Sequence, residues 1–311
     1  MNTGQYDIIG DIHGYADKLH ALLEKLGYTK GSGTYSHPKR KVIFLGDFID
    51  RGPQQQEVLD TVMAMVKGHH ALAVMGNHEF NALAYHTLDP KDSNAYLRPH
   101  LDKNTRQHQA FIDAYGTDST DPKLRSVLDF FYSLPLWLEI YGLRVVHACW
   151  HPKSITFMSD LLNTDNTLSH ELLVYASRKG TPVFEAVETL LKGVETTLPN
   201  HGSFIDKDGT QRKQVRLAWW SEQPVFWSQA TVPPNIISGP IADQRVPSDL
   251  ELGYSVGSPP VLFGHYWHSG VPEPLRPNAA CLDFSVAKGG KLCAYRWSGE
   301  HELCQSKFIY V

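Results

Sequence analysis

Six residues of metal-ligating types each follow a short apolar run of the sequence; they are Asp11, His13, Asp47, Asn77, His147 and His265. Carboxylate, imidazole and amide ligands in this mixture suit divalent Mn, Fe, Zn or Co, and they are too rich in nitrogen for Ca²⁺. Six ligands exceed what one tetrahedral zinc site uses. Two ions that share one carboxylate, roughly 3.5–4 Å apart, account for the number better. We therefore expect a centre of two divalent metal ions.

The first third of the chain contains the elements that must position these ligands. Apolar runs at Tyr6–Gly10, Lys41–Leu45 and Ala71–Met75 are typical of buried strands. Helical patterns at Tyr15–Leu26 and Pro53–Val66 separate the three runs. This alternation predicts parallel strands that are joined by helical crossovers.

Each of these predicted strands leads into a polar cluster. The clusters are GDIHG at 10–14, GDFIDRG at 46–52 and GNHE at 76–79. In parallel sheets with helical crossovers, the ligand site lies beyond the carboxyl ends of the strands. We therefore expect the three clusters to converge in space.

The rest of the chain is less regular. Residues 105–133 have a helical pattern, 136–146 are typical of a strand pair, and 155–193 contain further predicted helices. Residues 198–260 are rich in Pro, Gly and Trp, and we interpret them as an ordered lid or wall. Short apolar runs from 261 to 310 predict the strands of a second sheet.

The composition excludes several classes of protein. The 311 residues are 42% hydrophobic and 20% charged, which is near the globular average and disfavours disorder and coiled coils. The net charge of -4 offers no diffuse basic surface, so we expect no non-specific nucleic-acid binding. No run approaches the roughly 20 apolar residues that a membrane helix needs, so no membrane association is expected.

The start of the chain and its cysteines indicate the compartment. The beginning of the sequence has no apolar run of the kind found in a secretory signal. The four cysteines have no CxxC spacing, which favours unpaired and mostly buried thiols in a reduced, cytoplasmic protein. A bridge between Cys281 and Cys293, on neighbouring predicted strands, is the alternative.

The clusters carry a resemblance to a known family. GDIHG, GDFIDRG and GNHE, followed by the VH that ends at His147 and the GH that ends at His265, resemble the calcineurin-like metallophosphoesterase superfamily. GDFIDRG resembles its branch of Ser/Thr protein phosphatases and symmetrical dinucleoside-tetraphosphate hydrolases. The resemblance covers about 1–90, 143–152 and 261–300. It implies a single domain over 1–311, folded as an α/β/β/α two-sheet sandwich with long insertions at about 91–135 and 153–258.

The resemblance also implies a ligand set for the metals, of which Mn is the ion we expect first. Asp11 and His13 would hold the first metal, and Asp47 would bridge it to the second. The ligands of the second metal would be completed by Asn77, His147 and His265.

Catalytic roles follow from the same resemblance. His78 would be the general acid that protonates the leaving oxygen, and Asp50 would hold it in the protonated form. Arg51 would clamp the phosphoryl oxygens with its planar fork. A water between the two ions would become the attacking hydroxide. Arg216, just before a Trp219–Trp220 pair, is a candidate second phosphate clamp.

Some residues have a structural interpretation instead. The remaining histidines, His86 and His108 among them, are expected to be surface or structural residues. Many members of the superfamily have GHxH, in which the second His binds the first metal. Trp267 stands at that place here, and His268 comes one residue late, so neither is counted as a ligand. The Trp219–Trp220 pair could wall a pocket for a base or an aromatic side chain, but we expect it to pack in the core.

Three functions remain open from the sequence. The leading hypothesis is a two-metal phosphatase that acts on phosphate monoesters, like the Ser/Thr protein phosphatases. The alternative enzyme is a dinucleoside polyphosphate hydrolase, for which the aromatic residues of 198–260 could stack a base. A metal-binding module without turnover is the alternative from another class.

Overall fold

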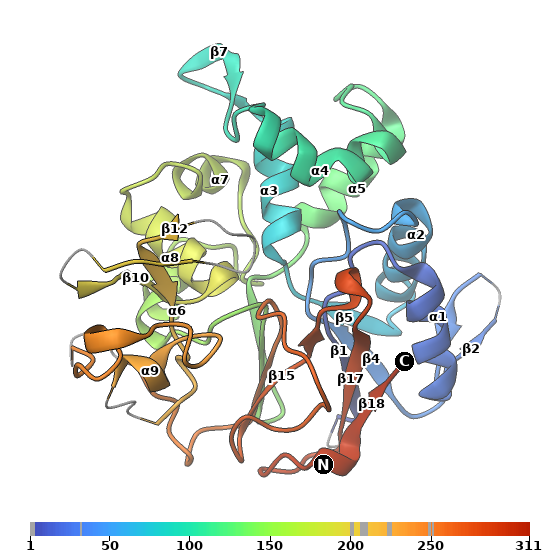
Figure 1. The fold of residues 1–311 in the computed structure, drawn as a ribbon. Helices are drawn as coiled ribbons and strands as arrows, with labels where there is room; N and C mark the ends of the chain where they lie inside the picture. Colours follow the sequence, from blue (N-terminus) through green and yellow to red (C-terminus); the bar gives the residue numbers. More distant parts are fainter. Residues whose placement is uncertain are drawn as a thin grey trace.

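The computed structural model describes residues 4–31, 33–199, 202–205, 211–222, 226–247, 250 and 252–311, and its elements are arranged around two sheets (Figure 1). The first sheet has the strand order β16-β17-β1-β4-β5, and β18 also pairs with β17. Its strands are β1 (Tyr6–Ile9), β4 (Lys41–Phe44), β5 (Ala71–Ala73), β16 (Asp283–Phe284), β17 (Lys291–Trp297) and β18 (Phe308–Tyr310). The parallel pairing of β1 with β4 and of β4 with β5 confirms the prediction for the first third of the chain.

The second sheet has the strand order β15-β14-β9-β8. Its strands are β8 (Trp137–Ile140), β9 (Leu143–Val146), β14 (Val261–Phe263) and β15 (Ala279–Cys281). β8 and β9 form the expected antiparallel pair, and they turn at Tyr141 and Gly142, which both have positive φ. β14 runs parallel to β9, and so the late segment that ends at His265 is brought beside the segment that ends at His147.

The prediction that the C-terminal strands all join the second sheet is wrong. β14 and β15 lie in the second sheet, whereas β16, β17 and β18 join the first. β17 pairs antiparallel with β1. Its side chains are apolar on both faces: Cys293 and Tyr295 pack in one core and Leu292 and Ala294 in the other. A strand with two apolar faces is suited to the interior of a sheet that is covered on both sides.

A shared core lies between the two sheets. Ile8 and Ile43 of the first sheet belong to the same buried cluster as Val145 and Leu262 of the second. In Figure 1, α1 (Ala16–Lys25) and α2 (Gln55–Lys67) lie on one side of the sheets, and α6 (Pro152–Ser159) and α8 (Pro182–Lys192) lie on the other. This is the expected α/β/β/α order of layers. α2 begins two residues later than predicted.

The helical pattern predicted at 105–133 corresponds to two helices. α4 (Asp102–Tyr115) ends at Gly116, whose φ of 74° suits a residue without a side chain. α5 (Pro122–Tyr132) begins after Asp121, whose carboxylate accepts the N–H groups of Lys123 and Leu124. Together with α3 (Asn77–His86), these helices form the upper part of the molecule in Figure 1. α4 therefore stands beside the carboxyl ends of the first sheet's parallel strands.

The described part of 198–260 is ordered and has a small core of its own. The core contains Leu198, Val215, Leu217, Trp227, Ala230 and Ile237. Around it lie β10 (Glu195–Thr197), β11 (Phe204–Ile205), β12 (Gln211–Arg212), β13 (Gln214–Arg216), α9 (Trp227–Ala230) and a 3₁₀ turn, Gly239–Ile241. β13 places Arg216 at the edge of the pocket that is described below. The rest of the predicted wall, at 200–201, 206–210, 223–225, 248–249 and 251, lies outside the described residues.

The smaller elements complete the fold. They are β2 (Thr29–Lys30), β3 (Tyr35–Ser36), β6 (Leu88–Asp89), β7 (Asp92–Tyr96), α7 (His170–Ala176) and the 3₁₀ turns Val286–Lys288 and Gln305–Lys307. All four cysteines are free, and the alternative bridge between Cys281 and Cys293 does not form. Among the described helices, none combines the length and the apolar character that a bilayer span requires.

Candidate metal centre and active-site pocket

The loops after the parallel strands are bound to one another and bent sharply. The N–H groups of Ile12 and His13 donate to the carbonyl of Asp47 at 3.0 and 2.8 Å, which joins the loops after β1 and β4. Positive φ angles of 50 to 75° occur at the non-glycine residues of this region, which are His13, Asp47, Asp50, Arg51, His265 and Trp267. Each such residue costs about 1–3 kcal/mol, so the surrounding hydrogen bonds must hold it in place. Backbone strain of this kind tends to cluster at functional sites.

His13 presents an unprotonated nitrogen to Asp47. Its Nδ1 donates to the carbonyl of Ile49 at 3.0 Å, and its buried Nε2 has no hydrogen-bond partner in the described part of the chain. Burial lowers the pKa of His13 to about 4, so the ring is neutral at pH 7. The Nε2 lone pair therefore lies 3.7 Å from the Asp47 carboxylate with no proton between the two atoms.

His147 repeats this arrangement on the other side of Asp47. Its Nδ1 donates to the carbonyl of Leu45 at 2.7 Å, so Nε2 is the ring nitrogen that faces Asn77 and Asp47. That nitrogen lies 3.1 Å from Oδ1 of Asn77 and 3.5 Å from Oδ1 of Asp47. His265 belongs to the same group, and both of its ring nitrogens are buried without a partner in the part of the chain described. Burial holds the pKa of His265 well below its usual value.

These donor atoms fit divalent cations. Two buried groups have ligand atoms close enough for one ion each: His13 with Asp47 and His78, and Asp47 with His147 and His265. Asp47 is common to both groups, as expected of a bridging ligand. Lone pairs that face one another in a buried site repel unless a cation lies between them, and this nitrogen and oxygen mixture suits Mn, Fe, Zn or Co.

Asp11 lies beside these groups but belongs to neither of them. Its carboxylate accepts the N–H of His265 at 3.1 Å and touches the backbone of Gly264, where an added Cβ would lie 2.0 Å from Oδ1. Burial raises the pKa of Asp11 well above its usual value, and the nearby carboxylates of Asp283 and Asp47 raise it further. A bound cation would remove this penalty.

Asp283 and Glu79 are two buried acids that the sequence analysis missed. Asp283 accepts the N–H groups of Trp267 at 2.7 Å and Ser285 at 2.9 Å. Glu79 accepts the N–H groups of Asp47 at 2.7 Å and of Gly76 at 3.0 Å, so it fixes the backbone of the shared ligand. The sequence could have indicated both acids. Asp283 directly follows the apolar run AACL, and Glu79 is the last residue of GNHE.

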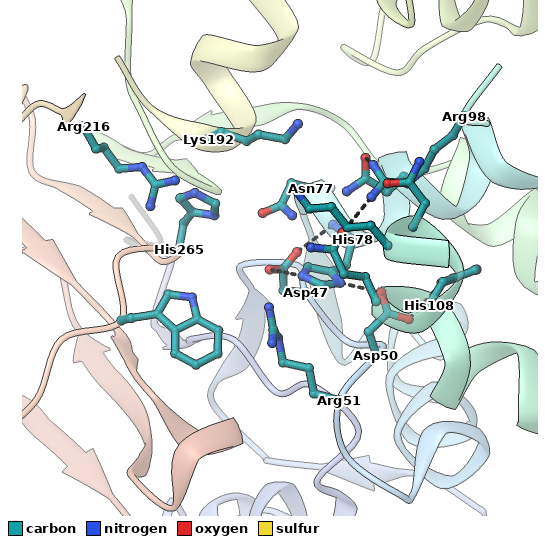
Figure 2. Close-up of a pocket in the computed structure, with 15 residues that line it drawn as sticks. Asp47, Asp50, Arg51, Asn77, His78, Arg98, His108, Lys192, Arg216 and His265 are labelled. Carbon is teal, nitrogen blue, oxygen red and sulfur yellow. Dashed lines mark hydrogen bonds and ion pairs between the residues drawn. The ribbon is translucent and has the colours of Figure 1, made fainter. Parts of the chain in front are cut away.

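His78 and Asp50 form the expected pair, and a third residue joins them. Nδ1 of His78 lies 2.5 Å from one oxygen of Asp50, and Nδ1 of His108 lies 2.8 Å from the other (Figure 2). Burial opposes protonation of His78, but the carboxylates of Asp47 and Asp50 outweigh it and raise its pKa. Burial also disfavours the charged form of Asp50, yet the hydrogen bonds from His108 and His78 hold its pKa below the usual value.

His108 therefore departs from its interpretation as an ordinary structural histidine. It lies on α4, and its Nε2 is 3.4 Å from Nε2 of the buried His86. The side chain meets Asp50 only because α4 packs over the loop after β4, and a contact across 58 residues has no local sequence signal.

We expect His108→Leu to slow turnover of substrates with poor leaving groups by about tenfold, because Asp50 would lose the partner that orients it toward His78. His108→Asn should restore much of the rate, since its amide can donate from nearly the same position as Nδ1. The measurement is kcat for an alkyl phosphate and for p-nitrophenyl phosphate. Equal losses on both substrates, without rescue by Asn, would assign His108 a purely structural role.

The metal-ligand groups open into a pocket of about 390 Å³ in which cationic side chains outnumber the acids Asp47 and Asp50. Its cationic side chains are Arg51, Arg98, Lys103, Lys192 and Arg216. In Figure 2, Arg216 and Lys192 lie on the side of His265, Arg98 and His108 lie on the opposite side, and Asp47 is between them. Arg216 thus lines the pocket as expected, where it also pairs with Glu195 at 3.1 Å.

Trp267 is the aromatic wall of this pocket, in place of the Trp219–Trp220 pair. Trp219 and Trp220 are buried, as expected of core residues, and Nε1 of Trp219 donates to the carbonyl of Ala148. The guanidinium of Arg51 lies 4.7 Å from the centre of the Trp267 ring, which is a cation–π contact. The residue that replaces the GHxH histidine therefore holds the expected phosphate clamp. His268 is in neither metal-ligand group of the described residues.

A model of the calcineurin-like phosphoesterase family matches residues 5–265. The chain belongs to this family. The match includes β1, β4 and β5 of the first sheet, β8, β9 and β14 of the second, and every ligand candidate from Asp11 to His265. Membership of the family indicates a metal-dependent hydrolase that acts on phosphate esters.

Curated relatives are similar to part of the chain. It is 47% identical over 144 residues to a protein of Oceanobacillus iheyensis that is named bis(5'-nucleosyl)-tetraphosphatase PrpE, asymmetrical. It is 49% identical over 75 residues to the protein of that name from Halalkalibacterium halodurans. These matches cover 46% and 24% of this chain, and 54% and 30% of the respective relatives. The chain therefore spans about half or less of the curated relatives it matches.

Two solved structures are similar to the chain at low sequence identity. A putative diadenosine tetraphosphatase is 20% identical with a TM-score of 0.48, and the match covers 99% of this chain and 93% of that one. A Saccharomyces cerevisiae Ser/Thr phosphatase with similarity to human PP5 is 15% identical with a TM-score of 0.46, over 100% and 80% of the two chains.

Proposed function

We propose that the protein hydrolyses phosphate anhydrides of nucleotides, with a dinucleoside polyphosphate as its substrate. The observation that carries this proposal is the set of five cationic side chains around the metal-ligand groups. Two divalent ions and one arginine suffice to neutralise a single phosphoryl group, and further cations suit a chain of phosphates. The names of the curated relatives support this alternative over the leading sequence hypothesis of a protein phosphatase.

The two ions, when bound, would activate water and neutralise charge on the phosphoryl oxygens. We propose the same ligands as before: Asp11, His13, Asp47, Asn77, His147 and His265. Asp47 accepts the N–H of His78 at 3.0 Å, and this hydrogen bond fixes the proposed acid relative to the shared ligand. The metal is proposed to be manganese.

The other pocket residues bind substrate and move a proton. Arg51, oriented by Trp267, would clamp the phosphoryl group that is attacked. Arg216 and Lys192 on one side and Arg98 on the other would hold neighbouring phosphates. His78 donates through Nδ1 to Asp50, which leaves Nε2 to deliver a proton to the leaving oxygen.

A phosphomonoesterase of the Ser/Thr phosphatase type is the second candidate, and the His78–Asp50 pair favours it. A serine or threonine alkoxide is a poor leaving group and needs an acid, whereas a phosphate leaving group needs one far less. The free thiols support the expected cytoplasmic location for either enzyme, because disulfides are rare there.

The two candidates separate in a substrate panel. With Mn²⁺ added, we expect kcat/KM for diadenosine tetraphosphate to exceed that for a phosphoserine peptide by about 100-fold, which corresponds to roughly 2.7 kcal/mol of transition-state binding. EDTA should abolish both activities, and p-nitrophenyl phosphate serves as the small control substrate. A preference for the peptide would support the second candidate. If none of the three substrates is hydrolysed with any divalent ion, the hypothesis of a metal-binding module without turnover would be supported instead.

A further inference from the structure

A second pocket of about 630 Å³ adjoins the first on the outer side of α4. Arg51, Lys103 and Gln107 line both pockets, so the two pockets share a wall. The second pocket adds Arg106 and Ala110 of the same helix. Residues 103, 106, 107 and 110 are spaced by three or four, which places them on one face of α4.

Positive charge exceeds negative charge in this second pocket, whose lining has three cationic side chains and one acid. Its lining includes Arg51, Lys103 and Arg106, and within the described residues none of the three forms an ion pair with a carboxylate. Nε of Arg106 donates instead to a main-chain carbonyl one turn earlier. The acid that lines the pocket, Asp113, accepts the amide of Gln109 at 2.7 Å.

The helix that carries this surface is held firmly against the catalytic loops. His108 on its inner face bonds Asp50, and Phe111 is fully buried in the core. Near the end of the helix, the amide of Gln56 in α2 donates to the carbonyl of Ala114 at 2.7 Å. The cations on the outer face are therefore positioned by the same contacts that fix the catalytic pair.

We propose that this second pocket binds the phosphates of the substrate that lie away from the bond being hydrolysed. Arg51 stands at the junction, where it would contact the reacting phosphoryl group, and Arg106 would receive the distal phosphates of the nucleotide. This inference rests on the proposed function and deepens it. A substrate with a single phosphate would not reach the second pocket.

The kinetic test compares two charge reversals. Arg106→Glu lies in the second pocket only, and Arg125→Glu, on the exposed face of α5, is the matched control. We expect Arg106→Glu to raise KM for diadenosine tetraphosphate about tenfold with kcat nearly unchanged, because unreactive parts of a substrate contribute uniform binding. KM for p-nitrophenyl phosphate should not change. Arg125→Glu should leave both substrates unaffected.

A binding test separates this inference from the proposed function. Calorimetry with inorganic tripolyphosphate on the metal-depleted chain needs no turnover. Arg106→Glu and Ala110→Glu should each weaken binding about tenfold relative to Arg125→Glu, since each puts a negative charge beside the anion. Wild-type affinity in both variants would refute the second site, whatever the enzyme hydrolyses. An Arg106→Glu effect confined to a phosphopeptide would also refute it and would assign the pocket to acidic peptides.

Discussion

Asp47→Asn is expected to lower kcat for any phosphate ester by about 10³-fold or more and to reduce bound manganese from two ions per chain to one or none. The physical reason is that both metal-ligand groups include this carboxylate, and an amide has neither its charge nor two equivalent oxygens. Elemental analysis of the purified protein, together with kcat for p-nitrophenyl phosphate, measures both effects.

The control for this substitution is Asp60→Asn, which makes the same chemical change on the exposed side of α2 and should keep full metal content and activity. Folding of the Asp47 variant can be followed by circular dichroism, because loss of the ions and loss of the fold would otherwise look alike. An Asp47→Asn protein that keeps two tightly bound ions would contradict the bridging role.

His78→Asn is expected to lower kcat by about 10²–10⁴-fold for an alkyl phosphate but only slightly for p-nitrophenyl phosphate. An alkoxide must be protonated as it leaves, whereas nitrophenolate leaves without help. Metal content should stay at two ions, because His78, although its ring lies within reach of the His13–Asp47 group, is proposed as an acid and the six proposed ligands remain. The slope of log kcat against the pKa of the leaving group should therefore become steeper in the variant.

His69→Asn is the matched control for that experiment. His69 is exposed and has a φ of 59°, a conformation that asparagine tolerates, so its substitution should change neither slope nor rate. If His78→Asn left the leaving-group dependence unchanged while slowing all substrates alike, His78 would act by holding Asp47 in place rather than as an acid.

The residue types and their spacing within each motif were sufficient to predict that the candidate ligands meet, because a strand end is a local property. Asp11, Asp47 and Asn77 each follow an apolar run, and parallel strands place their carboxyl ends at one edge. His147 and His265 were predicted in the same way, and the parallel pairing of β9 with β14 brings them together. The three loops and the two late histidines do meet.

Contacts between distant elements were not predictable from the sequence. His108 reaches Asp50 only through the packing of α4, and nothing in its neighbours distinguishes it from the other histidines. The assignment of β17 to the first sheet was missed for a related reason. An apolar strand can pair with either sheet, and only the folded structure shows that β17 pairs with β1.

Residue order alone therefore predicted a divalent-metal centre at the ends of alternating strands, together with its ligand types and a general acid beside them. Folding in three dimensions settled which cations share the pocket, why Trp267 rather than the Trp219–Trp220 pair forms its aromatic wall, and which histidine orients Asp50. The difference has a physical origin. Hydrophobic periodicity is a property of a few consecutive residues, so it can be recognised in the sequence. The charge around a buried site is the sum of side chains that come from separate helices and sheets, so it depends on the tertiary structure.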